Sequence, residues 1–304
     1  MKAPSTPSAP TRRRALTVTL ATAAAVIAAP AAVAVASPAA VSPAATTRPP
    51  RPLRHAHAHN DYLHPRPLYD ALAHGFTSVE ADIFLVDGEL LVAHDPAGLD
   101  PRRTLAALYL DPLRALVRAG HGSVHPHHRA PLQLLIDIKA DGVAAYRELD
   151  RQLARRRALF TRYHDGRVRP GAVTAVISGD RAARAPMEVQ RTRLAFYDGR
   201  LDDLGTASPA SFTPLISANW TQTFGWLGAG PFPRAERDRL RTLVTAAHRE
   251  GRRIRFWATP DLPGPEREAV WSELLAAGVD HLNTDDLAGL ERFLRAGAGA
   301  ARAS

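Results

Sequence analysis

Two histidines and two carboxylates that could take part in catalysis lie close together in the first third of the chain. His59 and His94 flank Glu80 and Asp82, which are separated by a single residue. Polar and apolar residues alternate over 77–84, which predicts a β-strand with both carboxylates on the same face. Carboxylates this close repel each other, and a hard divalent cation such as Ca²⁺ or Mg²⁺ would relieve that repulsion. Two acid–base groups beside a divalent-metal site are suited to cleaving a phosphodiester.

A further acidic and basic pair follows at 132–139, where an apolar run ends in Asp137 and Lys139. A strand places these two side chains on the same face. We expect Asp137 to be the third metal ligand and Lys139 to contact a phosphate oxygen of the substrate. Each of these motifs taken alone is common on solvated surfaces, but their combination in this order favours a catalytic site.

The elements that would position these side chains follow the pattern of an α/β protein. Apolar, β-branched or aromatic runs predict strands near 54–59, 77–84, 132–138, 172–178, 192–197, 213–217, 253–258 and 279–283. Helical stretches lie in most of the intervals, for example 68–74 and 236–248. This alternation predicts a (β/α)8 TIM-type barrel, in which catalytic groups sit at the carboxyl ends of the strands. Trp257 falls at such an end, and we expect it to line the substrate pocket.

The order of these residues resembles the phosphatidylinositol-specific phospholipase C and glycerophosphodiester phosphodiesterase superfamily. It is most similar to the branch of altered inheritance of mitochondria protein 6. Members share a (β/α)8 barrel with a histidine at the end of the first strand, Glu-x-Asp on the second, and His-Asp shortly afterwards. The corresponding residues here are His59, Glu80 with Asp82, and His94 with Asp95.

The resemblance implies roles for individual residues. His59 and His94 would be the catalytic acid and base, with the order of the two left open. Glu80, Asp82 and Asp137 would hold the cation. Asn60 follows His59 as in the calcium-dependent phospholipases C, where the asparagine is a metal ligand, and so is expected to be a fourth ligand here.

The chain departs from the glycerophosphodiesterase signature, because His59 is followed by Asn-Asp-Tyr instead of Arg-Gly. The Asp-x-Lys of residues 137–139 resembles the sphingomyelinase D branch instead. The resemblance is tightest over 54–95 and returns at 278–285, which is similar to the last strand of the superfamily. It implies a metal-dependent phosphoric diester hydrolase that acts on a phospholipid or a glycerophosphodiester by histidine acid–base catalysis.

Two alternatives remain open at this stage. His55 and His57 form a His-x-His pair that resembles the metal motif of amidohydrolases, and Asp285 would match that family's last-strand ligand. Amidohydrolases also need later histidines, and 196–198 and 217–219 contain none. The other alternative is a catalytically inactive barrel that only binds its ligand.

The N-terminal region predicts export. Three arginines at 12–14 precede an apolar stretch, and Ala-Val-Ala at 34–36 is a cleavage pattern, so 1–36 is interpreted as a signal peptide of the general secretory or twin-arginine type. Residues 37–52, rich in Ala, Pro, Ser and Thr, are expected to be a flexible linker. Residues 53–298 would then form a single barrel domain.

Composition narrows the range of partners. The formal net charge is +9, and removal of the four basic residues of the predicted signal leaves +5. The arginines are scattered without interleaved aromatic residues, which argues against a nucleic-acid partner and allows transient contact with an anionic membrane surface. We expect a monomer. The absence of cysteine excludes thiolate catalysis and thiolate metal sites.

Overall fold

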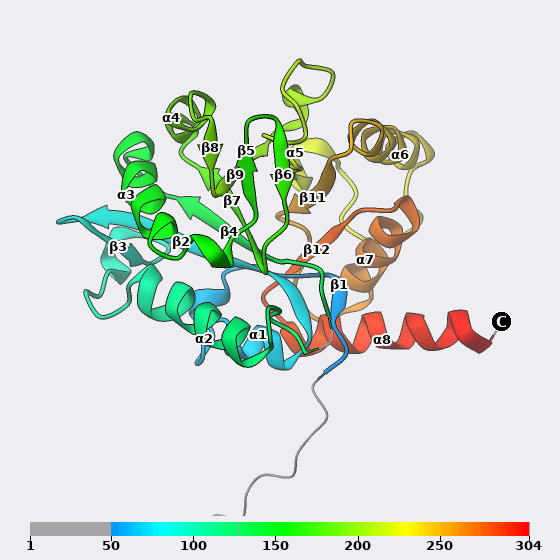
Figure 1. The fold of residues 1–304 in the computed structure, drawn as a ribbon. Coiled ribbons are helices and arrows are strands. Elements are labelled where there is room, and N and C mark those ends of the chain that lie inside the picture. The colour runs from blue at the N-terminus through cyan, green and yellow to red at the C-terminus, as the bar shows by residue number, and fades with distance from the viewer. Residues whose placement is uncertain (1–49, 127, 304) are drawn as a thin grey trace, which may run out of the picture. The chain divides into compact units, whose positions relative to one another are not determined.

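A closed parallel β-barrel forms the centre of the computed structural model, which describes residues 50–126 and 128–303 (Figure 1). Its strands are β1 (Leu53–Ala58), β2 (Phe76–Val86), β4 (Leu132–Ile138), β7 (Val173–Gly179), β9 (Ala195–Gly199), β10 (Leu215–Asn219), β11 (Arg253–Trp257) and β12 (His281–Thr284). They follow one another in the order β1, β12, β11, β10, β9, β7, β4 and β2, and the pairing of β1 with β2 closes the barrel. The predicted (β/α)8 barrel is therefore confirmed.

Helices surround the barrel (Figure 1). They are α1 (Tyr69–Ala73), α2 (Asp111–Ala119), α3 (Gly142–Ala154), α4 (Arg184–Glu188), α5 (Trp220–Thr223), α6 (Arg234–Arg249), α7 (Pro265–Ala277) and α8 (Leu287–Ala303). The helices predicted at 68–74 and 236–248 correspond to α1 and α6. Leu240, Val244 and Ala247 of α6 are buried at the spacing expected for one apolar face. Within the described residues, no helix combines the length and apolar character needed to span a membrane.

Short elements that the sequence pattern did not predict decorate the barrel. Strand β3 (Glu89–Val92) pairs antiparallel with the extended end of β2. A separate sheet joins β6 (Arg167–Arg169), β5 (Arg162–His164) and β8 (Thr192–Arg193). The strand predicted at 192–197 is therefore two strands, because Thr192 and Arg193 pair with β5 and the barrel strand begins only at Ala195.

The two faces of the barrel strands differ in chemistry, as β2 illustrates. Val79, Ala81 and Ile83 belong to the large apolar cluster between barrel and helices. Ser78 and Glu80 are buried as well, but they bond to polar partners, Ser78 to His57 of the adjacent β1 and Glu80 to Arg255 across the barrel interior. Barrel interiors are usually filled by branched apolar side chains. The polar filling here indicates that the interior supports a site.

The N-terminal predictions fall largely outside this description. The proposed signal at 1–36, and all but the last three residues of the linker at 37–52, lie outside the described residues. The described part of the chain forms one compact unit.

Candidate active site

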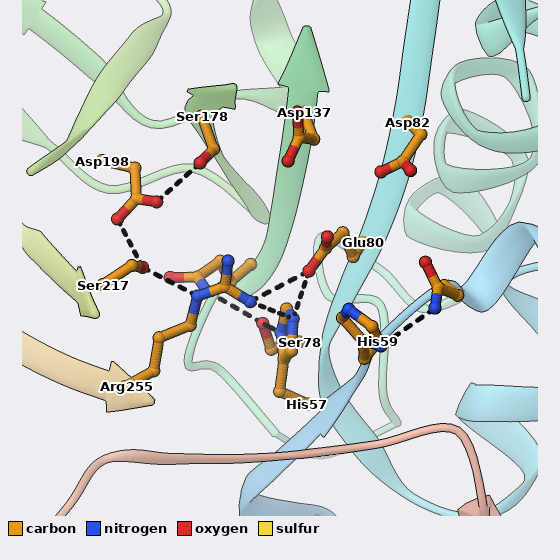
Figure 2. A network of polar contacts seen from close by, with 12 residues as sticks. His57, His59, Ser78, Glu80, Asp82, Asp137, Ser178, Asp198, Ser217 and Arg255 are labelled. Atoms are coloured by element: carbon orange, nitrogen blue, oxygen red, sulfur yellow. Dashed lines mark hydrogen bonds and ion pairs between the residues drawn. The ribbon is translucent and has the colours of Figure 1, made fainter. Parts of the chain in front are cut away.

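Three carboxylates converge at the carboxyl ends of β2 and β4 (Figure 2). Glu80 and Asp82 lie on one face of β2, and Asp137 is the direct neighbour of Asp82 in the parallel pairing with β4. Each residue offers an oxygen, and these oxygens lie within 4.8 Å of one another. The strand register thus brings together the three carboxylates that the sequence predicted as metal ligands.

The hydrogen bonds of Asp82 are distributed unevenly over its two oxygens. Oδ2 lies 2.6 Å from the Tyr62 hydroxyl, 2.7 Å from Lys139 Nζ and 3.1 Å from His94 Nδ1. Oδ1 is buried and has no partner among the described residues. A buried carboxylate oxygen without a partner costs free energy. A cation beside Oδ1 would remove that cost.

Asp137 and Lys139 complete this edge of the cluster. Burial, reinforced by the charges of Glu80 and Asp82, raises the pKa of Asp137 to about 6 although Lys139 opposes the shift. Lys139 Nζ lies 3.7 Å from Asp137 Oδ1 as well as close to Asp82. Burial lowers the pKa of Lys139, but these two carboxylates outweigh it and raise the pKa, so the ammonium is charged. Lys139 therefore stands where it could contact both the cluster and a phosphate.

His59 follows β1 and is held by a carboxylate from the neighbouring strand end. Its Nδ1 lies 2.9 Å from Asp285 Oδ1, directly after β12. Burial lowers the pKa of His59, but the hydrogen bond to Asp285 and the charges of Glu80 and Asp285 outweigh it, so the pKa is raised. Nε2 has no hydrogen-bond partner in the described part of the chain.

His94 follows β3 and approaches the cluster from another direction. Its Nδ1 lies 3.1 Å from Asp82 Oδ2, and 64% of its side chain is exposed. As with His59, no described residue bonds to its Nε2. Both predicted catalytic histidines thus have Nδ1 next to a carboxylate and Nε2 available.

Asn60 lies next to the cluster through Tyr62. Its Oδ1 is 2.8 Å from the Tyr62 hydroxyl, which also reaches Asp82. The left-handed backbone at Asn60 (φ 47°) is one that asparagine tolerates well. The segment that follows β1 is fixed by Asp61, whose Oδ2 accepts hydrogen bonds from the Leu68 amide and the Tyr109 hydroxyl. The role of Asn60 as a fourth ligand stays a prediction.

Trp257 is half-buried at the end of β11, where it pairs in register with Asn219 of β10. Its place at the carboxyl end of the barrel agrees with the predicted location. Its contact with substrate stays a prediction.

His55 and His57 do not form the metal-binding pair that the amidohydrolase alternative requires. His55 Nδ1 lies 3.1 Å from the Asp280 carbonyl oxygen, near the start of the barrel. His57 is fully buried and is engaged by Ser78 and Glu80. Burial, together with the nearby charge of Arg255, lowers the pKa of His57 to about 4, so its ring is neutral. Over the described residues, the group able to hold a metal is the carboxylate cluster.

Three residues of the site had no role in the predicted phosphodiesterase site. Asp285 holds His59, and its position after the last strand was a usable signal. Tyr62 links Asp82, Asn60 and His94. Arg255 reaches Glu80 from the opposite wall, and its alternation with the apolar Ile254 and Phe256 on β11 was the signal for an inward-facing side chain.

The donor set matches a hard divalent cation. All three clustered ligands supply carboxylate oxygens, and Asp82 Oδ1 is buried without a partner. Ca²⁺ and Mg²⁺ take oxygen ligands, whereas softer metals favour nitrogen and sulfur. Glu80, Asp82 and Asp137 thus fit the predicted cation.

Family models match two segments of the chain. Residues 47–198 match the AIM6-like phosphodiesterase domain. Residues 253–288 match the glycerophosphoryl diester phosphodiesterase family. The first segment contains both histidines, the carboxylate cluster and Lys139, and the second contains Arg255 and Asp285.

Curated relatives extend the similarity over most of the barrel. The chain is 30% identical over 255 residues to altered inheritance of mitochondria protein 6 homolog from Arthroderma benhamiae, covering 76% of this chain and 81% of that protein. It is 30% identical over 287 residues to altered inheritance of mitochondria protein 6 from Eremothecium gossypii, covering 82% and 72%. The corresponding protein from Lachancea thermotolerans is 27% identical over 271 residues, covering 76% and 63%.

Proposed function

The chain belongs to the AIM6-like phosphodiesterase family, and from this premise we propose that it is a metal-dependent phosphoric diester hydrolase that uses His59 and His94 as its acid–base pair. One observation carries the proposal. Each histidine has Nδ1 beside a carboxylate and Nε2 available, next to a cluster of three carboxylates whose Asp82 Oδ1 lacks a partner. A histidine oriented through one nitrogen can exchange a proton through the other.

The side chains divide the reaction between them. One histidine removes the proton of the attacking hydroxyl, which belongs to water or to the substrate itself. As the new P–O bond forms, the bond to the leaving alcohol breaks, and the other histidine gives the alcohol oxygen its proton. Lys139 places its ammonium beside the phosphate. A divalent ion held by Glu80, Asp82 and Asp137 would neutralise phosphate charge and lower the pKa of a hydroxyl next to it.

The surface around the site favours a lipid as the source of the phosphodiester. Exposed apolar side chains follow three strand ends: Leu63 and Tyr69 after β1, Leu227 after β10, and Leu262 after β11. Strands β10, β11, β12 and β1 are consecutive in the barrel, so these residues share one arc of its carboxyl end. Such side chains would contact acyl chains at the surface of a lipid aggregate.

Turnover by the metal-stripped protein, with and without added ions, tests the proposed phosphodiesterase activity. We expect cleavage of bis-p-nitrophenyl phosphate to return when Ca²⁺ or Mg²⁺ is added, and to be lost in Glu80→Gln. His59→Ala and His94→Ala should each lower turnover by about 10²- to 10⁴-fold. Wild-type turnover in either histidine variant would contradict the proposed pair. No turnover of this ester or of a phospholipid panel with any of the ions would favour a binding barrel.

Vesicle sedimentation tests the lipid surface separately. Leu63 and Leu262 are 68% and 86% exposed, so Leu63→Ser with Leu262→Ser should weaken binding to vesicles of phosphatidylcholine and phosphatidylserine. The matched control is Val189→Ser. Val189 is 82% exposed but precedes the start of β9, away from the carboxyl ends. Equal binding of both variants would show that the lipid-surface interpretation is wrong.

A further inference from the structure

A buried arginine reaches the carboxylate cluster from the far side of the barrel (Figure 2). Arg255 on β11 is 3% exposed, and its Nη1 lies 2.9 Å from Glu80 Oε2. The same nitrogen is 2.9 Å from His57 Nε2, which itself lies 3.0 Å from Glu80 Oε2. One oxygen of the candidate ligand Glu80 is thus already occupied by a fixed cation. Figure 2 shows the other oxygen on the side that faces Asp82 and Asp137.

Arg255 is also held through a second nitrogen of its guanidinium, Nε. Its Nε donates to Ser217 Oγ at 2.7 Å, and that hydroxyl donates to Asp198 Oδ1 at 2.6 Å. The guanidinium is therefore fixed between Ser217 and Glu80 and is too deeply buried to turn toward a substrate. Lys139, the other cation of the cluster, has a partly exposed side chain, and among the described residues its ammonium bonds only to Asp82 and Asp137.

The charges of the cluster suggest what a fixed cation does there. Three carboxylates face two cations, Arg255 and Lys139, which leaves one net negative charge. A divalent ion would turn this into one net positive charge, and a phosphodiester would neutralise it. Arg255 repels a cation at the cluster and attracts an anion there, and in a buried site both effects are only weakly screened.

We propose that Arg255 is a positioning residue that limits Glu80 to one oxygen toward the metal and couples metal binding to binding of the anionic substrate. The metal alone is then held weakly, and metal and phosphate strengthen each other's binding. Such coupling is reciprocal, because each ligand must change the affinity for the other by the same factor. The inference rests on the proposed function, since it assumes that the cluster holds the cation.

Titration calorimetry of Mg²⁺ into the metal-free protein tests this role without measuring turnover. At about pH 8, where Glu80 stays ionised, Arg255→Gln should bind Mg²⁺ about tenfold more tightly than wild type. The matched control is Arg253→Gln, which removes an arginine of the same strand that contacts His281 instead of the carboxylates. Arg253→Gln should change the affinity much less.

An Mg²⁺ affinity of Arg255→Gln that is equal to or lower than that of wild type would contradict the inference. If Arg255 only supported the fold, its loss would leave Mg²⁺ affinity unchanged or lower, and that result overturns the coupling while leaving the proposed function intact. No binding of Mg²⁺ by either protein, with or without inorganic phosphate, would overturn both.

A second measurement covers the case in which Arg255→Gln does not fold. In wild type, inorganic phosphate should raise Mg²⁺ affinity by about tenfold, and Mg²⁺ should raise phosphate affinity by the same factor. Independent binding of the two ligands would overturn the coupling. In a folded Arg255→Gln variant, the enhancement by phosphate should be smaller than in wild type.

Discussion

Two buried aspartates in the barrel interior have opposite surroundings. Asp198 on β9 receives the Ser217 hydroxyl on Oδ1 and the Ser178 hydroxyl on Oδ2 (Figure 2). Arg200 Nη1 also lies 2.9 Å from Oδ2. Asp82 on β2 collects its donors on Oδ2 and leaves Oδ1 buried without a partner among the described residues. Both residues are fully buried.

The difference separates a structural carboxylate from one prepared for a ligand. At Asp198 the protein supplies the compensation for burial, so the residue stabilises the fold. At Asp82 part of that compensation is missing, and its neighbours Glu80 and Asp137 add repulsion. A site that keeps such a deficit gives up stability in exchange for binding.

Asp82→Asn should have the largest effect on function. It removes one charge and one anionic ligand from the cluster, so we expect turnover to fall by at least about 10³-fold and Mg²⁺ binding to be lost. The melting temperature of the metal-free protein should change little, because relief of the repulsion from Glu80 and Asp137 offsets the weakened pairing with Lys139. Turnover with added Mg²⁺, calorimetry and thermal unfolding of the same preparation check the three parts. Mg²⁺ binding at wild-type affinity would contradict the role of Asp82.

Asp198→Asn should show the reverse pattern. It breaks an ion pair whose carboxylate is fully buried and places amide hydrogens against hydroxyl and guanidinium donors, so the free energy of unfolding should fall by about 3 kcal/mol. Mg²⁺ affinity should change far less than in Asp82→Asn. Urea unfolding with a Mg²⁺ titration measures both. An unchanged unfolding free energy would remove the distinction between the two aspartates.

Asp137→Asn should show how much the clustered carboxylates destabilise the fold, through the pH dependence of its free energy of unfolding. Because the pKa of Asp137 is raised from 3.8 to about 6, its contribution to stability is full below about pH 4 and is lost as the pH rises through about 6. The variant should therefore be more stable than wild type at about pH 7.5, by on the order of 2 kcal/mol, and equal to it at about pH 4.

Chemical unfolding of the metal-free proteins at the two pH values measures this difference. Asp198→Asn serves as the control, since it should be less stable than wild type at about pH 7.5. A loss of stability in Asp137→Asn at that pH would show that Asp137 is a structural carboxylate like Asp198.

Asp285→Asn should have the smallest effect of the four substitutions, and it changes the surroundings of His59 and of the Asn60 amide. The raised pKa of His59 means that its protonated form stabilises the fold below about pH 6.5 and that this contribution is lost as the pH rises through the folded-state pKa. Removing the Asp285 charge should lower that pKa. Titration of the metal-free protein by NMR checks it, with His94 as the internal reference. An unchanged His59 titration would contradict the role of Asp285.

The sequence predicted those parts of the fold and of the site that follow from local residue patterns. Alternation over 77–84 placed Glu80 and Asp82 on one face, and the eight apolar runs predicted the barrel that aligns Asp137 with Asp82. Residues that act across the barrel could not be paired in this way. Arg255 lies 175 positions from Glu80, and only closure of the barrel brings them into contact. The split of 192–197 into two strands likewise depends on pairing with the distant β5.

The position of a bound ion tests the central claim most directly. Crystals of the protein soaked in Mn²⁺, which takes oxygen ligands like Mg²⁺, would give an anomalous difference peak wherever the ion binds. We predict one strong peak in contact with Asp82 Oδ1 and with oxygens of Glu80 and Asp137, and none beside Asp198. A peak elsewhere, or no peak at the cluster in crystals that cleave a phosphodiester, would contradict the assignment of the cluster as the metal site.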